Sequence, residues 1–364
     1  MKISIGAQIV DGPWGGGNLF VKNFSQYLKN LGHNVVYDLK DKDIDAILLT
    51  DPRSKLDSSS AYNHVDIKRY KKFVNPNVVV IQRINECDER KGTKNINNLY
   101  LEASKVADRV IFVSEWLQNI YISLGMDETK TKVIYAGADK KIFNLENTNF
   151  SINKLEKIKL VTHHWSDNWN KGFDIYKRID DSISENYNSY EIEFTYIGNV
   201  PKNFKFKKSR LLNPIEGLDL ATELKRHDIY VTASINEPSG NHHIEAAQCG
   251  LPIIYRNSGG IPEYCEGFGV SFENDFFSKL DYLIENYDEY VEKVKNYPNN
   301  SNEMSNKFFE EFKNIVDNNI ETTNLYKPYK YNLYKFILFI NRVFELILFN
   351  KLYKLILYIK NNLK

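Results

Sequence analysis

The sequence predicts an α/β protein of two consecutive domains, each built on a doubly wound parallel sheet. Its 364 residues fit two domains of about 150 residues each. Short β-branched or apolar runs alternate with segments of helical periodicity, which is typical of parallel strands buried on both faces. A polar stretch at 144–153 interrupts this alternation, which then restarts. We therefore expect one domain at 1–150, a second at 151–320, and a separate tail at 326–364.

The first domain is expected to begin with a strand, a glycine-rich loop and a helix. An apolar run at 3–10 leads into the loop DGPWGGG at 11–17, after which large apolar residues recur at helical spacing until Gly32. The start lacks the apolar core and cleavage site of a signal peptide. Ser114 and Glu115 are expected to cap a later helix. Further strands are expected at 35–39, 46–50, 78–81 and 110–114, with helices at 99–107 and 115–124.

The second domain is expected to repeat this alternation. Strands are expected at 159–163, 192–197, 228–233 and 252–255, with helices after Gly172 and at 242–249. Ligands of open parallel sheets bind at the carboxyl ends of the strands. We therefore expect the functional site at that edge, in the cleft between the two domains.

The glycine loop at 11–17 fits neither common phosphate motif. A P-loop requires Lys and then Ser or Thr after its last glycine, but Asn18 and Leu19 follow Gly17. The dinucleotide fingerprint would place its third glycine at Phe20. Two interpretations remain: a flexible backbone that lets a ligand approach a helix N-terminus, or a tight turn without a ligand.

The net charge of +1 conceals an uneven distribution. Residues 326–364 contain eight Lys or Arg and one Glu, a net +7, whereas the other 325 residues carry a net −6. A slightly acidic body argues against nucleic-acid binding, which normally uses a basic face. Cys87, Cys249 and Cys265 are widely spaced and form no CxxC, which favours a reducing compartment such as the cytoplasm, without structural zinc.

The strongest functional signal lies in residues 228–263. A strand runs into a loop that contains Glu237, and a helix follows with Glu245 in its first turns. The next strand opens into Ser258-Gly259-Gly260. The loop and the helix N-terminus offer backbone N–H groups to an anion, while carboxylates accept hydrogen bonds from sugar hydroxyls. The segment therefore favours a site for a phosphorylated sugar compound.

This segment resembles the donor-binding segment of GT-B glycosyltransferases of family 4. The shared features are Glu237-x7-Glu245, Gly250-Leu251-Pro252 after the helix, and Gly259-Gly260-Ile261-Pro262-Glu263. The glycine loop at 15–17, the segment 133–139 and Lys171-Gly172 also resemble parts of that family, so the similarity spans residues 1–320. It implies a GT-B fold, in which two Rossmann-like domains face each other across a cleft, followed here by a helical tail.

The resemblance also implies a function. It predicts a retaining, hexosyltransferase-like enzyme that moves a sugar from a nucleotide diphosphate sugar to a hydroxyl of a glycan or lipid-linked saccharide. Glu237 would bind a hydroxyl of the donor sugar and Lys171 the diphosphate, and these are the expected catalytic residues. Glu245 would bind the ribose. The other residues expected to bind the donor are Ser239, Gly240, Asn241, Gly259, Gly260, Gly16, Gly17, His164 and Arg256.

We expect no metal and no other cofactor. Fixed cations and amide dipoles suffice to stabilise a departing diphosphate. The adjacent histidine pairs at 163–164 and 242–243 lack the i, i+4 spacing of a helical zinc site. The acids at 41, 43 and 45 precede a strand, so a solvated turn is favoured there.

Two positions depart from the family pattern. Ser166 stands where the family usually has an arginine that shares the diphosphate, so a histidine or Arg256 would supply the second cation, or the site works with less charge. The histidine that the first domain of the family often presents is also absent. Arg83, Asn85 and Glu86 occupy its place, and we predict that they bind the acceptor.

Three functional classes remain open. The first is a glycosyltransferase, the second is a GT-B sugar-nucleotide epimerase or glycosyl phosphorylase, and the third is a non-catalytic sugar-nucleotide binder. An epimerase or phosphorylase would need different acids in the cleft, and a phosphorylase would also need a lysine for its cofactor. The missing arginine and histidine keep the third class open.

The tail at 326–364 mixes aromatic, Leu and Ile residues with lysines. No apolar run in it exceeds five residues, whereas a membrane-spanning helix needs about 18. We expect a helix that lies in the interface of an anionic membrane, so that the enzyme is peripheral on the cytoplasmic face. The alternative is a helix that packs on the body or on a partner subunit.

Overall fold

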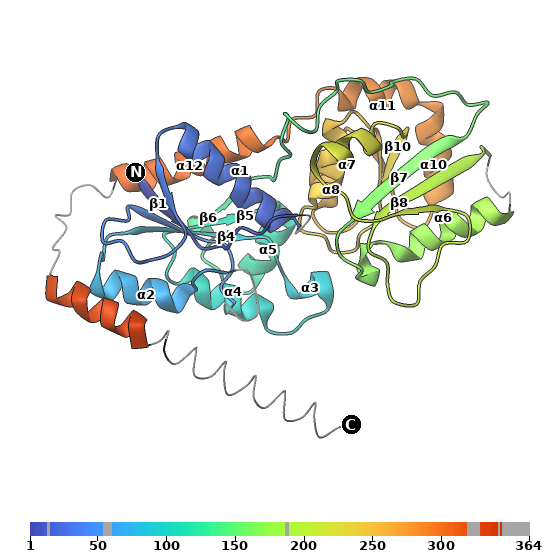
Figure 1. The fold of residues 1–364 in the computed structure, drawn as a ribbon. Coiled ribbons are helices and arrows are strands. Elements are labelled where there is room, and N and C mark those ends of the chain that lie inside the picture. The colour runs from blue at the N-terminus through green and yellow to red at the C-terminus, as the bar shows by residue number, and fades with distance from the viewer. Residues whose placement is uncertain (13–14, 54–59, 186–188, 319–327, 341–342, 344–364) are drawn as a thin grey trace, which may run out of the picture.

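The computed structural model describes residues 1–12, 15–53, 60–185, 189–318, 328–340 and 343. These residues form two α/β domains, each with a six-stranded sheet whose paired strands are all parallel (Figure 1). The predicted fold class is confirmed. The strand order is β2-β1-β3-β4-β5-β6 in the first sheet and β12-β11-β10-β7-β8-β9 in the second.

The first domain has helices on both faces of its sheet. Its strands are β1 (Lys2–Ile5), β2 (Asn34–Val36), β3 (Ala46–Leu49), β4 (Val79–Ile84), β5 (Arg109–Phe112) and β6 (Thr131–Val133). Its helices are α1 (Gly16–Asn30), α2 (His64–Phe73), α3 (Asp88–Lys91), α4 (Ile96–Ser104), α5 (Glu115–Ser123) and the short η1 (Glu128–Lys130). The apolar residues of α1 pack on one face of the sheet, and those of α2, α4 and α5 pack on the other.

The second domain repeats this plan. Its strands are β7 (Ile158–His164), β8 (Ile192–Gly198), β9 (Arg210–Leu212), β10 (Ile229–Thr232), β11 (Ile253–Arg256) and β12 (Gly269–Phe272). Its helices are η2 (Trp169–Lys171), α6 (Phe173–Glu185), α7 (Gly217–Leu224), α8 (Asn241–Gln248), α9 (Ile261–Cys265), α10 (Phe276–Glu285) and α11 (Tyr287–Val294). The strands β7, β10 and β11 at the centre of the sheet bring their carboxyl ends towards the first domain (Figure 1).

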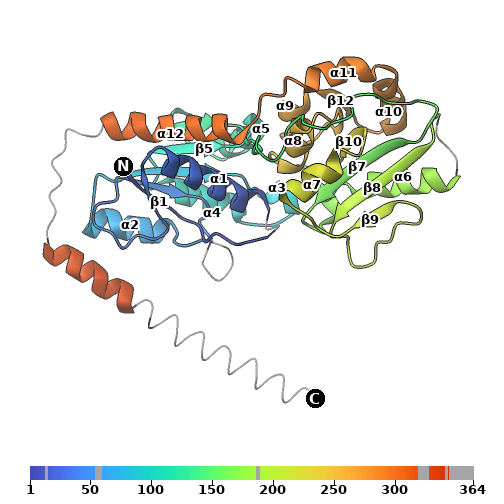
Figure 2. The same cartoon turned by 45° about the horizontal axis from the view of Figure 1, so that its top comes forward.

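The last helix of the body, α12 (Ser301–Asn318), returns to the first domain and lies beside α1 in both views (Figures 1 and 2). Phe308 packs on Phe20 with ring centroids 5.0 Å apart, and Phe312 stacks on Phe24 at 6.2 Å. Helix α12 therefore covers the face of the first sheet that α1 also covers.

Part of the tail also packs on the first domain. Residues 328–340 are helical, and Tyr334 is 1% exposed. The Tyr334 hydroxyl donates a hydrogen bond to the Leu39 carbonyl at 2.9 Å, and its ring meets that of Tyr70 on α2 at 5.9 Å. No helix within the described ranges is long and apolar enough to cross a membrane. Residues 326–327, 341–342 and 344–364 of the predicted tail lie outside the described residues.

Candidate functional site

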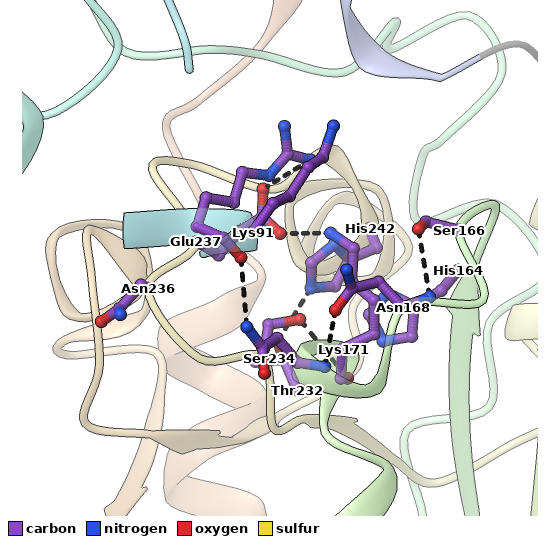
Figure 3. Close-up of polar contacts among 12 residues, drawn as sticks. Lys91, His164, Ser166, Asn168, Lys171, Thr232, Ser234, Asn236, Glu237 and His242 are labelled. Carbon is purple, nitrogen blue, oxygen red and sulfur yellow. Dashed lines mark hydrogen bonds and ion pairs between the residues drawn. The ribbon is translucent and has the colours of Figure 1, made fainter. Parts of the chain in front are cut away.

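The candidate site lies at the carboxyl ends of β7 and β10, where Lys171, Glu237 and His242 converge (Figure 3). Lys171 ends η2, the short turn that follows β7. The Asn168 side chain accepts a hydrogen bond from the Asn170 backbone N–H at 2.9 Å and thereby caps this turn. The Asn170 carbonyl in turn accepts the Ile235 N–H at 2.7 Å, which joins the turn to the loop carrying Glu237.

Glu237 is a buried carboxylate held between two cations. One of its oxygens forms an ion pair with Lys171, and the other lies 3.2 Å from the Arg90 guanidinium. Burial would raise the pKa of Glu237, but Arg90 and Lys171 outweigh burial and lower it to about 2. Burial lowers the pKa of Lys171, and Glu237 offsets part of that effect. Glu237 is therefore ionised at neutral pH although it is only 4% exposed.

Arg90 reaches this carboxylate from the first domain. It lies on α3, where it also contacts Glu86 at 3.2 Å, and Lys91 contacts the same Glu86 oxygen at 3.2 Å. Two second-domain asparagines hold the carbonyls of α3: Asn170 donates to the Arg90 carbonyl at 3.3 Å and Asn236 to the Glu89 carbonyl at 3.1 Å. We call this set of contacts between Arg90, Asn170, Asn236, Glu237 and α3 the α3 latch.

Three histidines of the site carry no charge in this arrangement. Burial lowers the pKa of His164 and His242 well below the usual range and that of His243 to about 3, so all three are neutral at neutral pH. His164 bonds to the Tyr176 hydroxyl at 2.8 Å, and His242 bonds to Thr232 at 2.8 Å. Arg256 forms its ion pair with Asp174 on α6. The second cation on Glu237 is Arg90.

Glu245 lies on α8 and is buried. Its carboxylate bonds to His163 Nε2 at 2.9 Å, so it is separated from Glu237 and pairs with a different strand-end residue. Ser239 is buried in the loop before α8, and Gly240 is the N-cap of this helix. Asn241 begins α8. A Cβ added to Gly16 would lie only about 3.0 Å from the Asn241 side chain. The glycine loop of the first domain therefore faces the N-terminus of α8, while Gly17 has open space around it.

Gly259 and Gly260 pack directly on the loop of Glu237. Gly259 has a φ of 66°, and a Cβ there would overlap the Glu237 backbone. A Cβ on Gly260 would overlap the Pro238 carbonyl and the side chain of Ser114 from the first domain. The Gly260 N–H donates to the Glu237 carbonyl at 2.9 Å. Only glycine leaves enough room for this turn, which fixes the backbone beneath the Glu237 carboxylate.

Glu263, in the same motif, has a role that the sequence did not indicate. Its carboxylate accepts the backbone N–H groups of Glu115 and Trp116, each at 2.7 Å, at the N-terminus of α5 in the first domain. Tyr264 next to it donates to the Val113 carbonyl and accepts the Ala136 N–H at 2.9 Å. These contacts form a second bridge between the domains. As predicted, Ser114 caps α5, accepting the Leu117 N–H at 3.3 Å.

The three residues predicted on the acceptor side do not form one cluster. Arg83 is the residue before the last one of β4 and is buried, with its guanidinium 4.2 Å from the centre of the Phe20 ring. Glu86 faces Arg90 and Lys91 instead. Asn85 lies between them in the chain and is half-buried. In the described part of the chain, no group of three or more His, Cys, Asp and Glu side chains is arranged to hold a metal ion. Whether the protein needs a metal stays a prediction.

Comparison with known proteins places this site in a family. Residues 160–296, which contain Lys171, Glu237 and Glu245, match the family model Glycosyl transferases group 1. The second half of the chain is therefore similar to this family. A stretch of 104 residues is 33% identical to the phosphatidylinositol N-acetylglucosaminyltransferase GPI3 subunit of Saccharomyces cerevisiae. That match covers 26% of this chain and 23% of the yeast subunit, so it spans about a quarter of the length of that relative.

Solved structures extend the similarity to both domains. A glycosyltransferase from Rickettsia africae superposes with a TM-score of 0.62 at 16% identity, covering 87% of this chain and 98% of that chain. Sucrose-phosphate synthase from Thermosynechococcus elongatus gives a TM-score of 0.65 at 13% identity and covers 87% and 99% of the two chains. Anabaena HepE in complex with UDP gives 0.64 at 14% identity and covers 86% and 100%. The chain therefore has the GT-B fold of these glycosyltransferases.

Proposed function

We propose that this glycosyl transferases group 1 protein is a retaining glycosyltransferase that uses a nucleotide diphosphate sugar as donor. The observation that carries the proposal is the buried, ionised Glu237 between Lys171 and Arg90, at the strand ends where open α/β sheets bind ligands. The solved structure of HepE with UDP and glucose is consistent with such a donor. The acceptor is a hydroxyl of a glycan or of a lipid-linked saccharide.

The arrangement of charges suits the chemistry of the transfer. Cleavage of the bond between sugar and phosphate builds positive charge on the sugar ring and negative charge on the leaving diphosphate. Lys171 and Arg90 stabilise the diphosphate electrostatically, and the Glu237 carboxylate accepts a hydrogen bond from a hydroxyl of the donor sugar. Glu245, with its separate partner His163, binds the ribose hydroxyls. The amides near Gly16, Gly259 and Gly260 line the phosphate and acceptor side of the site.

In this proposal Arg90 replaces the family arginine that is missing at Ser166. Both residues would bring a guanidinium to the diphosphate, but Arg90 comes from the first domain and the family residue from the second. The donor site is then complete only while the α3 latch holds the two domains together.

The test is a panel of UDP-, GDP- and ADP-sugars with purified full-length protein. Transfer or slow donor hydrolysis is expected with one donor, with retention of the anomeric configuration by NMR and no loss of rate in EDTA. Glu237→Gln and Lys171→Met should each reduce kcat by roughly 10²–10³-fold. Lys177→Met, an exposed lysine that pairs with Asp181 on α6, is the matched control and should leave kcat unchanged.

Other outcomes would decide between the remaining classes. Net epimerisation of the donor sugar or phosphorolysis of a glycan would replace the transferase proposal. Binding of nucleotide sugar without turnover of any donor, with or without acceptor, would identify a non-catalytic binder.

We also propose that the tail brings this enzyme to the cytoplasmic face of a membrane with anionic lipids. Tyr331, Tyr334 and Leu338 of helix 328–340 pack on the first domain. Other apolar residues of this helix are exposed, namely Tyr329, Leu333, Phe336, Phe339 and Ile340, and so is Val343. The tail carries a net +7, and aromatic and aliphatic side chains interspersed with lysines suit the interface of an anionic bilayer.

A further inference from the structure

Arg83 is a buried arginine without a counter-charge. It is 4% exposed, its Nε is buried without a hydrogen-bond partner, and no ion pair or hydrogen bond of its guanidinium is found among the described residues. The titratable groups that influence it are Tyr264 and Tyr100, whose pKa values burial raises further above the usual value, so neither supplies a negative charge at neutral pH. Burial lowers the pKa of Arg83 to about 10, which still leaves the group protonated at neutral pH.

Other buried or half-buried arginines among the described residues each have a carboxylate. Arg90 contacts Glu86 and Glu237, Arg53 pairs with Asp51, and Arg256 pairs with Asp174. A buried charge is costly unless it is paired and hydrogen-bonded. The unpaired state of Arg83 therefore indicates that a ligand supplies its partner.

The surroundings of Arg83 hold its guanidinium in place and add positive potential. The guanidinium lies over the ring of Phe20, which restricts its plane. Phe20 is in the second turn of α1, and side chains on a helix lean towards its N-terminus. Arg83 therefore lies beside α1, whose first turn has Gly15 as N-cap, no side-chain cap and no acidic residue. Both features favour an anion.

We propose that Arg83 and the first turn of α1 bind an oxyanion, a phosphate or a carboxylate, that is carried by the acceptor. The donor diphosphate has its own cations in Lys171 and Arg90, which meet on Glu237. Arg83 belongs to the first domain, at the carboxyl end of a central strand. The inference rests on the proposed transferase function and adds the chemical class of the acceptor.

The first experiment measures binding of inorganic phosphate to the full-length protein saturated with UDP, so that the donor site is occupied. Titration calorimetry and thermal unfolding are run against sodium chloride of equal ionic strength. Phosphate is expected to raise the Tm of the wild type, and Arg83→Met is expected to weaken phosphate binding at least tenfold. Arg69→Met, which removes a surface arginine paired with Asp66, is the control and should bind phosphate like the wild type.

Thermal stability separates a binding role from a structural role. Methionine retains the apolar packing on Phe20 without the buried charge, so Arg83→Met without phosphate should unfold at the same temperature as the wild type or at a higher one. Arg83→Lys retains a charge without the planar fork and should bind phosphate more weakly than the wild type. A lower Tm of Arg83→Met together with unchanged phosphate binding would overturn the proposal.

The second experiment uses transfer to three acceptors that share one hydroxyl-bearing group. These are glycerol, glycerol 1-phosphate, and vesicles of phosphatidylcholine with phosphatidylglycerol, which distinguish a neutral acceptor, a soluble phosphate and a lipid phosphate. The wild type should prefer one phosphorylated acceptor over glycerol at least tenfold, and Arg83→Met should lose this preference. Normal UDP binding without phosphate binding or acceptor preference would reject this inference and leave the donor proposal intact.

Discussion

Glu237 keeps its charge in a buried position because two cations from different domains share its two oxygens. The contribution of this pairing to the stability of the protein therefore depends on pH. The pKa of Glu237 is about 2 in the folded protein, below its ordinary value of 4.5. The stabilisation from its ionised form is therefore complete above about pH 4.5 and is lost as the pH falls towards 2.

Arg90→Met should reduce this effect at the residue scale. The variant leaves Glu237 with Lys171 alone, so its pKa should rise towards the ordinary value. The free energy of unfolding should fall by about 1–3 kcal/mol at pH 7. The difference from the wild type should shrink between pH 5 and pH 3, as measured by urea unfolding.

Lys91→Met is the matched control for this prediction. Lys91 contacts Glu86 but not Glu237 and is 41% exposed, so its loss should cost less than about 0.5 kcal/mol. If the two variants lost the same stability at every pH, Arg90 would not act through Glu237.

The residues of the site differ in how far the sequence predicts them. Glu237, Glu245, Gly259 and Gly260 belong to one local pattern of strand, loop and helix, so the resemblance of that segment to a known family includes all four. Arg90 is 147 residues away from Glu237 and belongs to another domain, and no local pattern joins the two. The adjacent bases Arg90 and Lys91 after Glu86 were the only available signal.

At the scale of elements, buried strands were found where the sequence predicts them, whereas several of the observed helices, such as α2, were not predicted. Strands such as β4 and β10 are apolar on both faces and are recognisable without their neighbours. Helix α2 was missed because charged residues dominate it. Its capping box of Asn63 and Asp66 was the signal that would have revealed it. For the tail, the helix itself was predicted but its two faces were not. Its charges lie on several sides of the helix, so the packed face and the exposed face can be told apart only in the structure.

The two faces of helix 328–340 give separate predictions. Phe336 and Phe339 are 59% and 64% exposed. Replacing both by Ser should abolish sedimentation with phosphatidylcholine–phosphatidylglycerol vesicles and change the Tm little. Tyr334→Ala should instead cost about 3–5 kcal/mol of stability, because it removes a buried aromatic ring. The double serine variant also retains the packing of the helix, whereas deletion of 326–364 removes it.

Vesicle composition provides the control for the tail. Binding of the wild type should fall on vesicles of phosphatidylcholine alone and at high salt, since the tail carries a net +7. Equal binding of the serine variant and the wild type would contradict the membrane proposal. A concentration-dependent mass increase in light scattering that the serine variant lacks would identify a second copy of the chain as the partner.

At the scale of the whole molecule, the two domains are joined by contacts of different kinds. In the first kind, the chain itself runs between the domains: Ala138 pairs with Asn300, and α12 packs on the first domain. The α3 latch and the bond of Glu263 to α5 join the domains on the side of the site. The contacts of the α3 latch and of Glu263 are single hydrogen bonds and ion pairs, each worth about 1 kcal/mol. They can therefore be broken without unfolding either domain.

In the triple variant Asn170→Ala, Asn236→Ala and Glu263→Ala, the two domains should therefore move apart on the side of the site. Its radius of gyration from X-ray scattering should exceed that of the wild type, while each domain keeps its own core. Nucleotide affinity should change little, because Glu245 and the α8 N-terminus belong to the second domain alone. The value of kcat should fall at least tenfold, because opening withdraws Arg90 from the diphosphate. Reduced nucleotide affinity with unchanged kcat would instead show that the latch residues act within the second domain, and that Arg90 does not complete the site by closure.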